Sequence, residues 1–209
     1  MNNLIIIGAG GMGRTLYDMA RESVGYNKEF TIKGFIDDNL KALDNFKNYP
    51  PILSAIKEYS PKPKDVFVCS IGGRSRKACI NSILTKGGKI TTLIHQTARI
   101  GSNVELGEGN YIGAFTTIAA DAKIGDFNFI QSYTIIGHDV EIGNWNRIDS
   151  QVFMVGATKI GNNNFLHTGC MINHNVSVGD DCVIGAKALV TLDVESGSTL
   201  FSQPARRLK

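Results

Sequence analysis

The chain has 209 residues, 43% of them hydrophobic, which is enough for one large domain or two small ones with packed cores. Its formal net charge of +3 is small and dispersed, which argues against nucleic-acid binding. The four cysteines have no CxxC spacing, so they favour neither a zinc site nor a secreted disulfide framework, and we expect a cytoplasmic protein without a metal.

The first part of the chain alternates predicted strands with predicted helices. The opening apolar run, residues 4–7, is far short of the roughly 18 residues that a membrane span needs, and no basic segment precedes it. We therefore expect neither a signal peptide nor a membrane span. The predicted elements are a strand at 4–7, a helix at 12–24, a strand at 31–36, a short helix at 52–58, a strand at 66–71 and a helix at 74–86. This alternation predicts a small parallel sheet, an α/β Rossmann-like half domain over residues 1–88.

A glycine loop, GAGGMG, follows the first strand and opens the first helix. Its Gly8, Gly10 and Gly11 favour close approach of the backbone to a phosphate. Asp37 and Asp38 end the next strand, where the dinucleotide fingerprint has an acidic ribose ligand. Alone, these features favour an NAD-dependent oxidoreductase, but about three strands are only half of a doubly wound fold and leave no place for a nicotinamide. We predict a site for the nucleotide of an activated sugar; the alternative is a turn that only packs strand against helix.

From residue 100 onward an aliphatic residue recurs at every sixth position. The set is Ile100, Leu106, Ile112, Ile118, Ile124, Ile130, Ile136, Ile142, Ile148, Met154, Ile160, Leu166, Ile172, Val178, Ile184 and Val190. Apolar residues recur at every third or fourth position in an amphipathic helix and at every second position in a strand, so a period of six predicts a short strand plus a turn. Glycines from Gly107 and asparagines from Asn110 recur every 18 residues, which predicts triangular coils of three strands. Coils stacked about 4.8 Å apart would bring the asparagines into a ladder.

The hexads IGSNVE, LGEGNY, IGDFNF, IGNWNR and IGNNNF resemble the repeat of the hexapeptide acyltransferases. This resemblance implies a left-handed parallel β-helix, whereas ordinary parallel crossovers are right-handed. We assign residues 89–209, with a C-terminal tail, to this second domain.

Four histidines are candidates for proton transfer, because imidazole titrates near neutral pH. His95 precedes the first coil and is interpreted as structural, while His167 is predicted to point outward. His138 and His174 are predicted on the same corner, two coils apart. Only His138 is followed by a carboxylate, Asp139, which suits fixing a tautomer and stabilising the imidazolium. A solvated corner histidine is the alternative.

Four segments, GAGGMGR, FIDDN, IHQTARIG and TIIGHDVEIGN, resemble the bacterial sugar acetyltransferases across essentially the whole chain. That family includes sialic acid O-acetyltransferases and N-acetyltransferases for nucleotide-linked 4-amino-4,6-dideoxy sugars. The resemblance implies His138 as general base with Asp139, acetyl-CoA as co-substrate and a nucleotide sugar as acceptor. It also implies acetyl-CoA along the coils near Gly156 and Gly161, in sites between the chains of a homotrimer.

The chain departs from the family pattern in two places. Arg147 stands where some members carry a second histidine, nine residues after the base. The ending FSQPARRLK matches the family's ending only in part; Arg206 and Arg207 are predicted to meet coenzyme A phosphates, or else to form a solvated basic tail.

One column of the repeat has polar residues in place of the usual glycine. Gln131, Asp149 and His167 are predicted to face outward on successive coils. Such a ladder lines either a substrate cleft or a subunit interface, or it is plain cross-strand pairing.

The sequence thus favours an acetyl-CoA-dependent N-acetyltransferase that acts on the 4-amino group of a nucleotide-linked sugar by direct transfer. A covalent route through Cys170 or Cys182 is disfavoured, because both occupy small inward positions. The close rival is a sialic acid or other sugar O-acetyltransferase. From a different class, the chain is a non-catalytic trimeric scaffold.

Overall fold

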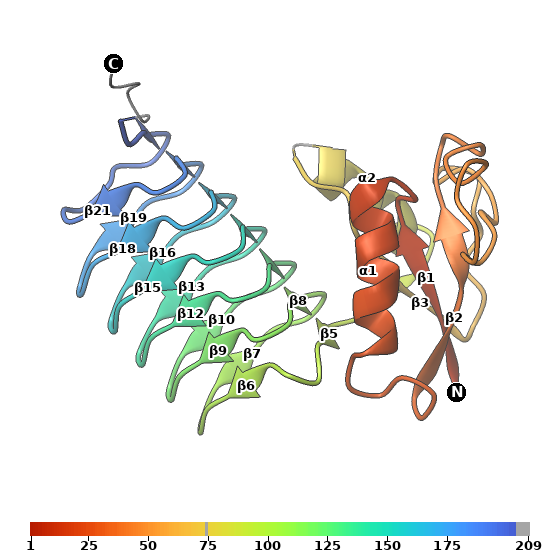
Figure 1. Ribbon diagram of the computed structural model, residues 1–209, viewed down its shortest axis with the longest axis horizontal. Helices are drawn as coiled ribbons and strands as arrows, with labels where there is room; N and C mark the ends of the chain where they lie inside the picture. Colours follow the sequence, from red (N-terminus) through yellow and green to blue (C-terminus); the bar gives the residue numbers. More distant parts are fainter. Residues whose placement is uncertain (74, 204–209) are drawn as a thin grey trace, which may run out of the picture. The chain divides into compact units, whose positions relative to one another are not determined.

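The computed structural model describes residues 1–73 and 75–203. The chain divides into two compact units, Met1–Gln96 and Thr97–Lys209, which are coloured red to yellow-green and green to blue (Figure 1). Residues 89–96, which the sequence analysis placed with the second domain, belong to the first unit. No helix in the described part of the chain has the length and apolar character needed to cross a bilayer.

The first unit is built on a small parallel sheet. Its strands lie in the order β2-β1-β3-β4, and two helices accompany them. The elements are β1 (Asn2–Ile7), α1 (Gly11–Arg21), β2 (Phe30–Ile36), β3 (Asp65–Cys69), α2 (Ser75–Leu84), β4 (Lys89–Ile90) and β5 (Leu93–Ile94). The predicted α/β half domain is therefore present. β1 is an inner strand of its sheet, so we expect apolar residues on both faces of this strand and no alternation with polar ones. Residues 4–7 of β1 are fully buried, as an inner parallel strand requires.

The predicted helix at 52–58 is wrong. Ile52 instead forms a parallel bridge with Phe35 of β2, and Leu53 donates a backbone hydrogen bond to the Phe35 carbonyl at 2.8 Å. Two prolines, Pro50 and Pro51, hold the preceding backbone extended, and the open edge of β2 offers hydrogen-bond partners to an extended chain. The apolar residues of this segment thus lie along a sheet edge.

The second unit is a three-sided parallel β-helix made of two-residue strands. Each strand pairs in parallel with the strand 18 residues away, for example Lys123 with Glu141 and Ile124 with Ile142. Face 1 comprises β7 (Glu105–Leu106), β10 (Lys123–Ile124), β13 (Glu141–Ile142), β16 (Lys159–Ile160) and β19 (Ser177–Val178). The strands of face 2 that belong to this unit are β8 (Tyr111–Ile112), β11 (Phe129–Ile130), β14 (Arg147–Ile148), β17 (Phe165–Leu166), β20 (Val183–Ile184) and β22 (Thr199–Leu200). Face 3 comprises β6 (Arg99–Ile100), β9 (Thr117–Ile118), β12 (Ile135–Ile136), β15 (Phe153–Met154), β18 (Met171–Ile172) and β21 (Leu189–Val190).

The predicted six-residue register is confirmed by burial. The second residue of nearly every strand points inward and is buried, as Ile124, Ile142 and Ile160 are on face 1. Ile100, in the first coil, is the clearest departure because its side chain stays exposed. The coils are stacked side by side along the axis of the unit (Figure 1).

The corners of the β-helix adopt a backbone conformation that the sequence analysis did not foresee. From Asn103 to Lys187 every sixth residue has a positive φ, between 55° and 69°. Thirteen of these residues are not glycine, and they include Phe127 and Trp145. Such residues pay a steric penalty in the left-handed region, so the stacking of each coil on its neighbours must hold them there. Asp139 is one of these corner residues.

The predicted asparagine ladder is present, although most of its bonds go to the backbone. Asn128 accepts a hydrogen bond through Oδ1 from the backbone N–H of Asn146, and Asn146 does the same for Asn164. The Asn146 amide also donates to the Gly161 carbonyl and to Asn128 Oδ1. Each asparagine therefore ties its own corner to a neighbouring coil.

Candidate active site

His138 and Asp139 form a hydrogen-bonded pair in the turn that joins β12 to β13. Their Nδ1 and Oδ2 atoms are 2.7 Å apart. Both side chains are largely exposed, at 63% for the imidazole and 61% for the carboxylate. A carboxylate at Nδ1 favours the tautomer with its proton on that nitrogen, which leaves the Nε2 lone pair for a proton from a ligand. The structure thus brings the two predicted residues together on this corner, and their roles as base and orienting acid stay predictions.

Gly156, one coil further along, lies directly against the His138 ring. A Cβ at this position would come within 2.6 Å of both Nε2 and Cε1 of the imidazole. The same corner is tied by a backbone hydrogen bond of 2.9 Å from Ala157 to the His138 carbonyl. The absence of a side chain at 156 therefore sets the place of the ring, whereas the predicted contact of Gly156 with a cofactor stays a prediction.

The other three histidines differ from His138 in their surroundings. His174 lies on the same corner two coils away and makes no hydrogen bond with the described residues. His95 is buried, with its Nε2 3.0 Å from a carboxylate oxygen of Glu22, in keeping with a structural role. His167 belongs to a different corner.

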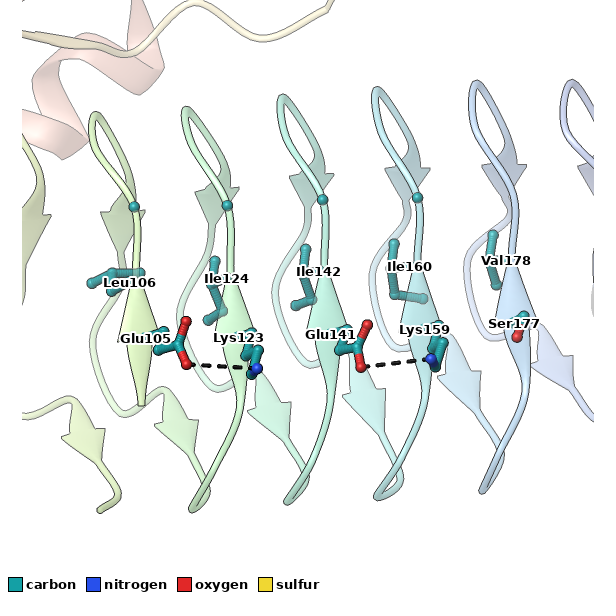
Figure 2. A pocket seen from close by; sticks show the side chains of 14 residues that line it. Glu105, Leu106, Lys123, Ile124, Glu141, Ile142, Lys159, Ile160, Ser177 and Val178 are labelled. Carbon is teal, nitrogen blue, oxygen red and sulfur yellow. Dashed lines mark ion pairs between the residues drawn. The ribbon is translucent and has the colours of Figure 1, made fainter. Parts of the chain in front are cut away.

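An open groove of about 740 Å³ runs along face 1. Figure 2 shows its charged rows, in which Glu105 pairs with Lys123 at 3.6 Å and Glu141 with Lys159 at 3.5 Å. These exposed pairs contribute little to stability. Gly161, a predicted cofactor contact, lines this groove. The His138 turn lies beside the middle of this groove, because β13, the middle strand of face 1, follows that turn directly.

The cysteines of the β-helix are buried. Cys170 and Cys182 have no exposed surface. Burial raises the pKa of the Cys170 thiol to about 12, so this thiol is not ionised at neutral pH. The geometry agrees with the expectation that neither thiol acts as a nucleophile.

The glycine loop of the first unit leaves the start of α1 open. Gly8 has a φ of +97°, and a Cβ there would come within 2.7 Å of Ser70 Oγ. Gly10 caps α1 and Gly11 is its first residue. A Cβ on Gly10 would meet nothing within 4 Å. Backbone N–H groups at a helix start attract anions, so the predicted phosphate contacts fit this end of α1.

The acidic pair after β2 binds backbone groups of its own unit. Asp37 accepts hydrogen bonds from the backbone N–H groups of Ala9, at 2.6 Å, and Asn39, at 2.8 Å. Asp38 accepts one from the backbone of Ile56 at 3.0 Å. Asp37 thus fixes the glycine loop, and the predicted contacts of both residues with a nucleotide stay predictions.

Sequence reasoning missed a cation next to this loop. The guanidinium of Arg14 stacks over the Phe46 ring, with Cζ 3.6 Å from the ring centroid. Arg14 ends the segment GAGGMGR, so its position directly after the glycines was the feature of the sequence from which a cation beside the loop could have been predicted.

The polar ladder on the corner between faces 2 and 3 is also present. Gln131 donates to Asp149 at 2.7 Å, and His167 Nδ1 lies 3.0 Å from the same carboxylate. Arg147, which the sequence analysis noted only as a departure from the family, joins them through its Nε at 2.8 Å. The two remaining predicted residues, Arg206 and Arg207, lie outside the described residues.

Two family models match the chain. The model described as PglD N-terminal domain covers residues 3–83, and the model described as bacterial transferase hexapeptide covers residues 157–191. No curated protein sequence matches. The matched segments confirm the resemblance that the sequence motifs indicate.

Several solved structures share the fold over the whole chain. The acetyltransferase domain of PglB from Neisseria gonorrhoeae has a TM-score of 0.86 at 24% identity and covers 100% of both chains. A histidine mutant of perosamine N-acetyltransferase from Caulobacter crescentus, in complex with CoA and GDP-perosamine, has a TM-score of 0.84 at 23% identity and covers 99% of this chain and 96% of its own. WeeI from Acinetobacter baumannii has a TM-score of 0.64 at 23% identity, with 100% of both chains covered. The Rossmann-like half domain and the left-handed β-helix are thereby confirmed.

Proposed function

We propose that this chain, which joins a PglD N-terminal domain to bacterial transferase hexapeptide repeats, is an acetyl-CoA-dependent sugar acetyltransferase with His138 as its general base. The observation that carries the proposal is the His138–Asp139 pair, 2.7 Å between Nδ1 and Oδ2, on an exposed corner of the β-helix. An imidazole oriented in this way accepts a proton through Nε2.

Two of the structural neighbours support the choice of acetyl-CoA. The PglB acetyltransferase domain also has a structure in complex with acetyl coenzyme A, and the perosamine N-acetyltransferase structure holds CoA. In this chain the groove on face 1 offers a long surface beside the His138 turn, with Gly161 in its lining. We assign the acetyl-CoA arm to this groove.

The proposed reaction is a direct transfer. The acceptor nitrogen or oxygen attacks the thioester carbonyl, and His138 takes its proton through Nε2. Asp139 stabilises the imidazolium, and backbone N–H groups stabilise the oxyanion. The new bond to the acetyl carbon forms first and gives this tetrahedral oxyanion; its collapse breaks the carbon–sulfur bond, and the proton passes from His138 to the departing thiolate of coenzyme A.

For the acceptor we favour a nucleotide-linked 4-amino-4,6-dideoxy sugar. The open start of α1 at Gly10 and Gly11 suits a diphosphate. A structurally similar protein, PerB from Caulobacter crescentus, has been solved in complex with GDP-perosamine. Asp37 would then help to bind the nucleotide indirectly, because its hydrogen bond to Ala9 holds the glycine loop in place. A sialic acid O-acetyltransferase is the second candidate, because His138 serves a hydroxyl as well as an amine.

We further propose a homotrimer, located in the cytoplasm. The outward residues of face 3 include exposed apolar side chains, among them Ile135, Met171 and Leu189. Phe115 and Tyr133 stack on each other at the adjoining corner and are also exposed. A contiguous apolar surface of this kind favours association with other copies of the chain.

The test is acetyl transfer by the purified full chain, with mass spectrometry of the products. We expect transfer to a nucleotide-linked 4-amino sugar and loss of most of this activity in His138→Ala. His174→Ala is the matched control, because His174 lies on the same corner without a carboxylate partner. Near wild-type activity of His138→Ala would overturn the base assignment, and transfer to sialic acid alone would overturn the acceptor.

A further inference from the structure

A cation without an acidic partner among the described residues lies beside the glycine loop of the first unit. Arg14 is the fourth residue of α1 and is half-buried, and its guanidinium makes no hydrogen bond or ion pair with the described residues. Asp18 stands four positions later on α1, a spacing that brings arginine and aspartate together on a helix, yet these two side chains form no ion pair. The guanidinium is therefore held by something other than a carboxylate.

The side chain of Arg14 extends towards the start of α1. Helical side chains tilt towards the N-terminus of their helix and lie over the residue three or four positions earlier. One of these residues is Gly11, and Nη2 of the guanidinium lies 3.9 Å from the position that a Cβ on Gly11 would take. A Cβ on Gly10 would meet nothing within 4 Å. The guanidinium thus borders the open space at these two glycines.

The ring of Phe46 fixes the plane of this guanidinium. Arg14 Cζ lies 3.6 Å from the ring centroid, a stacking distance at which an aromatic ring attracts a cation. Stacking covers a face of the guanidinium and leaves its N–H groups, which lie in its plane, to donate hydrogen bonds. Phe46 is itself 45% exposed, so its ring contributes little to a core. The main contact of this exposed ring is therefore the cation.

Tyr49, three residues after Phe46, anchors the segment that carries the ring. Its own ring packs edge-on against Tyr17 of α1, with the centroids 5.4 Å apart, and against Phe35 of β2, with the centroids 6.5 Å apart. The rings of Tyr17 and Phe35 also contact each other, at 6.2 Å. Three rings thus tie this segment to both the helix and the sheet, and the position of Phe46 follows from that anchor.

We propose that Arg14 binds a phosphate group of a nucleoside diphosphate and that Phe46, anchored through Tyr49, is the positioning residue that orients the guanidinium towards that phosphate. This role rests on the nucleotide-linked acceptor of the proposed function. A guanidinium donates two parallel hydrogen bonds to two phosphate oxygens, which a lysine ammonium does not do. The backbone N–H groups at Gly10 and Gly11 thereby gain a charged contact that depends on a ring outside the glycine loop.

The test is calorimetry of the full chain with GDP and with UDP at one ionic strength, with guanosine and uridine as probes that lack phosphate. Arg14→Gln is expected to weaken diphosphate binding about tenfold, as loss of charge-assisted hydrogen bonds does, and to leave nucleoside binding unchanged. Arg21→Gln is the matched control, because it removes the same charge from the other end of α1, where the guanidinium lies 5.6 Å from the Tyr17 ring. Equal weakening by the two variants would overturn the role of Arg14.

Phe46 is tested through its effect on Arg14. Phe46→Leu is expected to weaken diphosphate binding about threefold, as loss of an exposed cation–π contact does, and Phe46→Tyr is expected to keep the wild-type affinity. In the Arg14→Gln background, Phe46→Leu should have no further effect. A loss that persists in that background, or that is equally large for the nucleoside, would mean that the ring contacts the ligand itself and would overturn the positioning role. Thermal unfolding followed by circular dichroism checks that each variant is folded.

The role of Arg14 and the acetyltransferase activity can fail separately. Unchanged diphosphate binding in Arg14→Gln, together with acetyl transfer to a nucleotide-linked sugar, would overturn the role of Arg14 and leave the proposed function standing. Diphosphate binding that depends on Arg14, without acetyl transfer to any sugar, would do the reverse. Absence of saturable binding of either diphosphate to the wild type would overturn both the role of Arg14 and the nucleotide-linked acceptor.

Discussion

The Cα of Gly156 lies against the imidazole of His138, so that a Cβ on Gly156 would come within 2.6 Å of Nε2. The two residues are in successive coils of the same corner. One coil thus supplies the proposed base and the next supplies the surface on which its ring rests. The place of Nε2 is therefore a property of the stack and not of the His138 turn alone.

Gly156→Ala should displace this ring without unfolding the coil, since the added methyl meets the end of an exposed side chain. We expect kcat of acetyl transfer to fall about tenfold or more, because a shift of about 1 Å at a reacting group is costly. The measurement is a double-mutant cycle with His138→Ala. If Gly156→Ala slows the His138→Ala variant as much as it slows the wild type, the effect does not act through the ring.

Asp139→Asn should preserve the backbone conformation of the corner and change the tautomer of the His138 imidazole. Asparagine tolerates the positive φ of 58° at this position. Its amide nitrogen, however, would favour an unprotonated Nδ1 and so place the proton on Nε2, where the base needs its lone pair. We expect kcat to fall by about tenfold, an amount within the range of general-base effects. Asp121→Asn, one coil earlier at the same corner position, is the control; equal losses in both variants would contradict the orienting role.

The stacked fold was open to prediction because each inward position repeats the same environment every six residues. The corners were not, since their left-handed residues include Phe127 and Trp145, which no local preference places there. That conformation comes from the backbone of neighbouring coils. The left-handed corners could therefore be found only in the structure.

The sites divide in the same way. His138 and Asp139 are adjacent in sequence, so their pairing was predictable. Asp149 binds Arg147, two residues before it in the chain, and His167, one coil later, whereas the sequence predicts Arg147 only as a departure from the family pattern. Asp37 was predicted as a ligand because of its place after β2, yet both of its oxygens bind backbone N–H groups. Residue type and spacing do not reveal such local partners.

Asp65 should make the first unit sensitive to acid. Burial by itself raises the pKa of this carboxyl, but hydrogen bonds from Lys33 and Tyr59 outweigh it and lower the pKa to about 2, from an ordinary value of 3.8. A carboxyl with a lowered folded pKa stabilises the protein fully above its unfolded pKa. This contribution, about 2 kcal/mol, is therefore lost as the pH falls from about 4 towards 2.

The check is urea unfolding between pH 7 and pH 2, followed by helical circular dichroism, because both described helices lie in the first unit. Asp65→Asn should be less stable at pH 7 and should lose less stability over the acid range than the wild type. Asp18→Asn, at an exposed position on α1, is the matched control. An unchanged acid dependence in Asp65→Asn would refute the assignment.

Asn146→Ala should weaken the β-helix from within. The Asn146 side chain is fully buried, accepts from the Asn164 backbone and donates to the Gly161 carbonyl. Alanine leaves the buried Asn164 N–H and the partly buried Gly161 carbonyl without these partners, and the cost is about 1–3 kcal/mol for the buried group and less for the other. We expect a loss of about 2–4 kcal/mol in urea unfolding followed by the fluorescence of the neighbouring Trp145. Asn173→Ala, at an exposed corner position, should change little; a comparable loss there would argue against the ladder.

Met171→Glu should separate the proposed trimer. Met171 lies in the outward row of face 3 and is exposed in the single chain, with exposed Ile135 and Leu189 in the same row. A carboxylate in the middle of this row would have to be buried on association, without a partner of opposite charge, which is costly. Analytical ultracentrifugation should show trimers for the wild type and monomers for Met171→Glu. Ser177→Glu adds the same charge on face 1 and should leave the trimer intact, because the apolar row is on another side of the β-helix. A monomeric wild type, or a trimer that persists in Met171→Glu, would place the contact elsewhere.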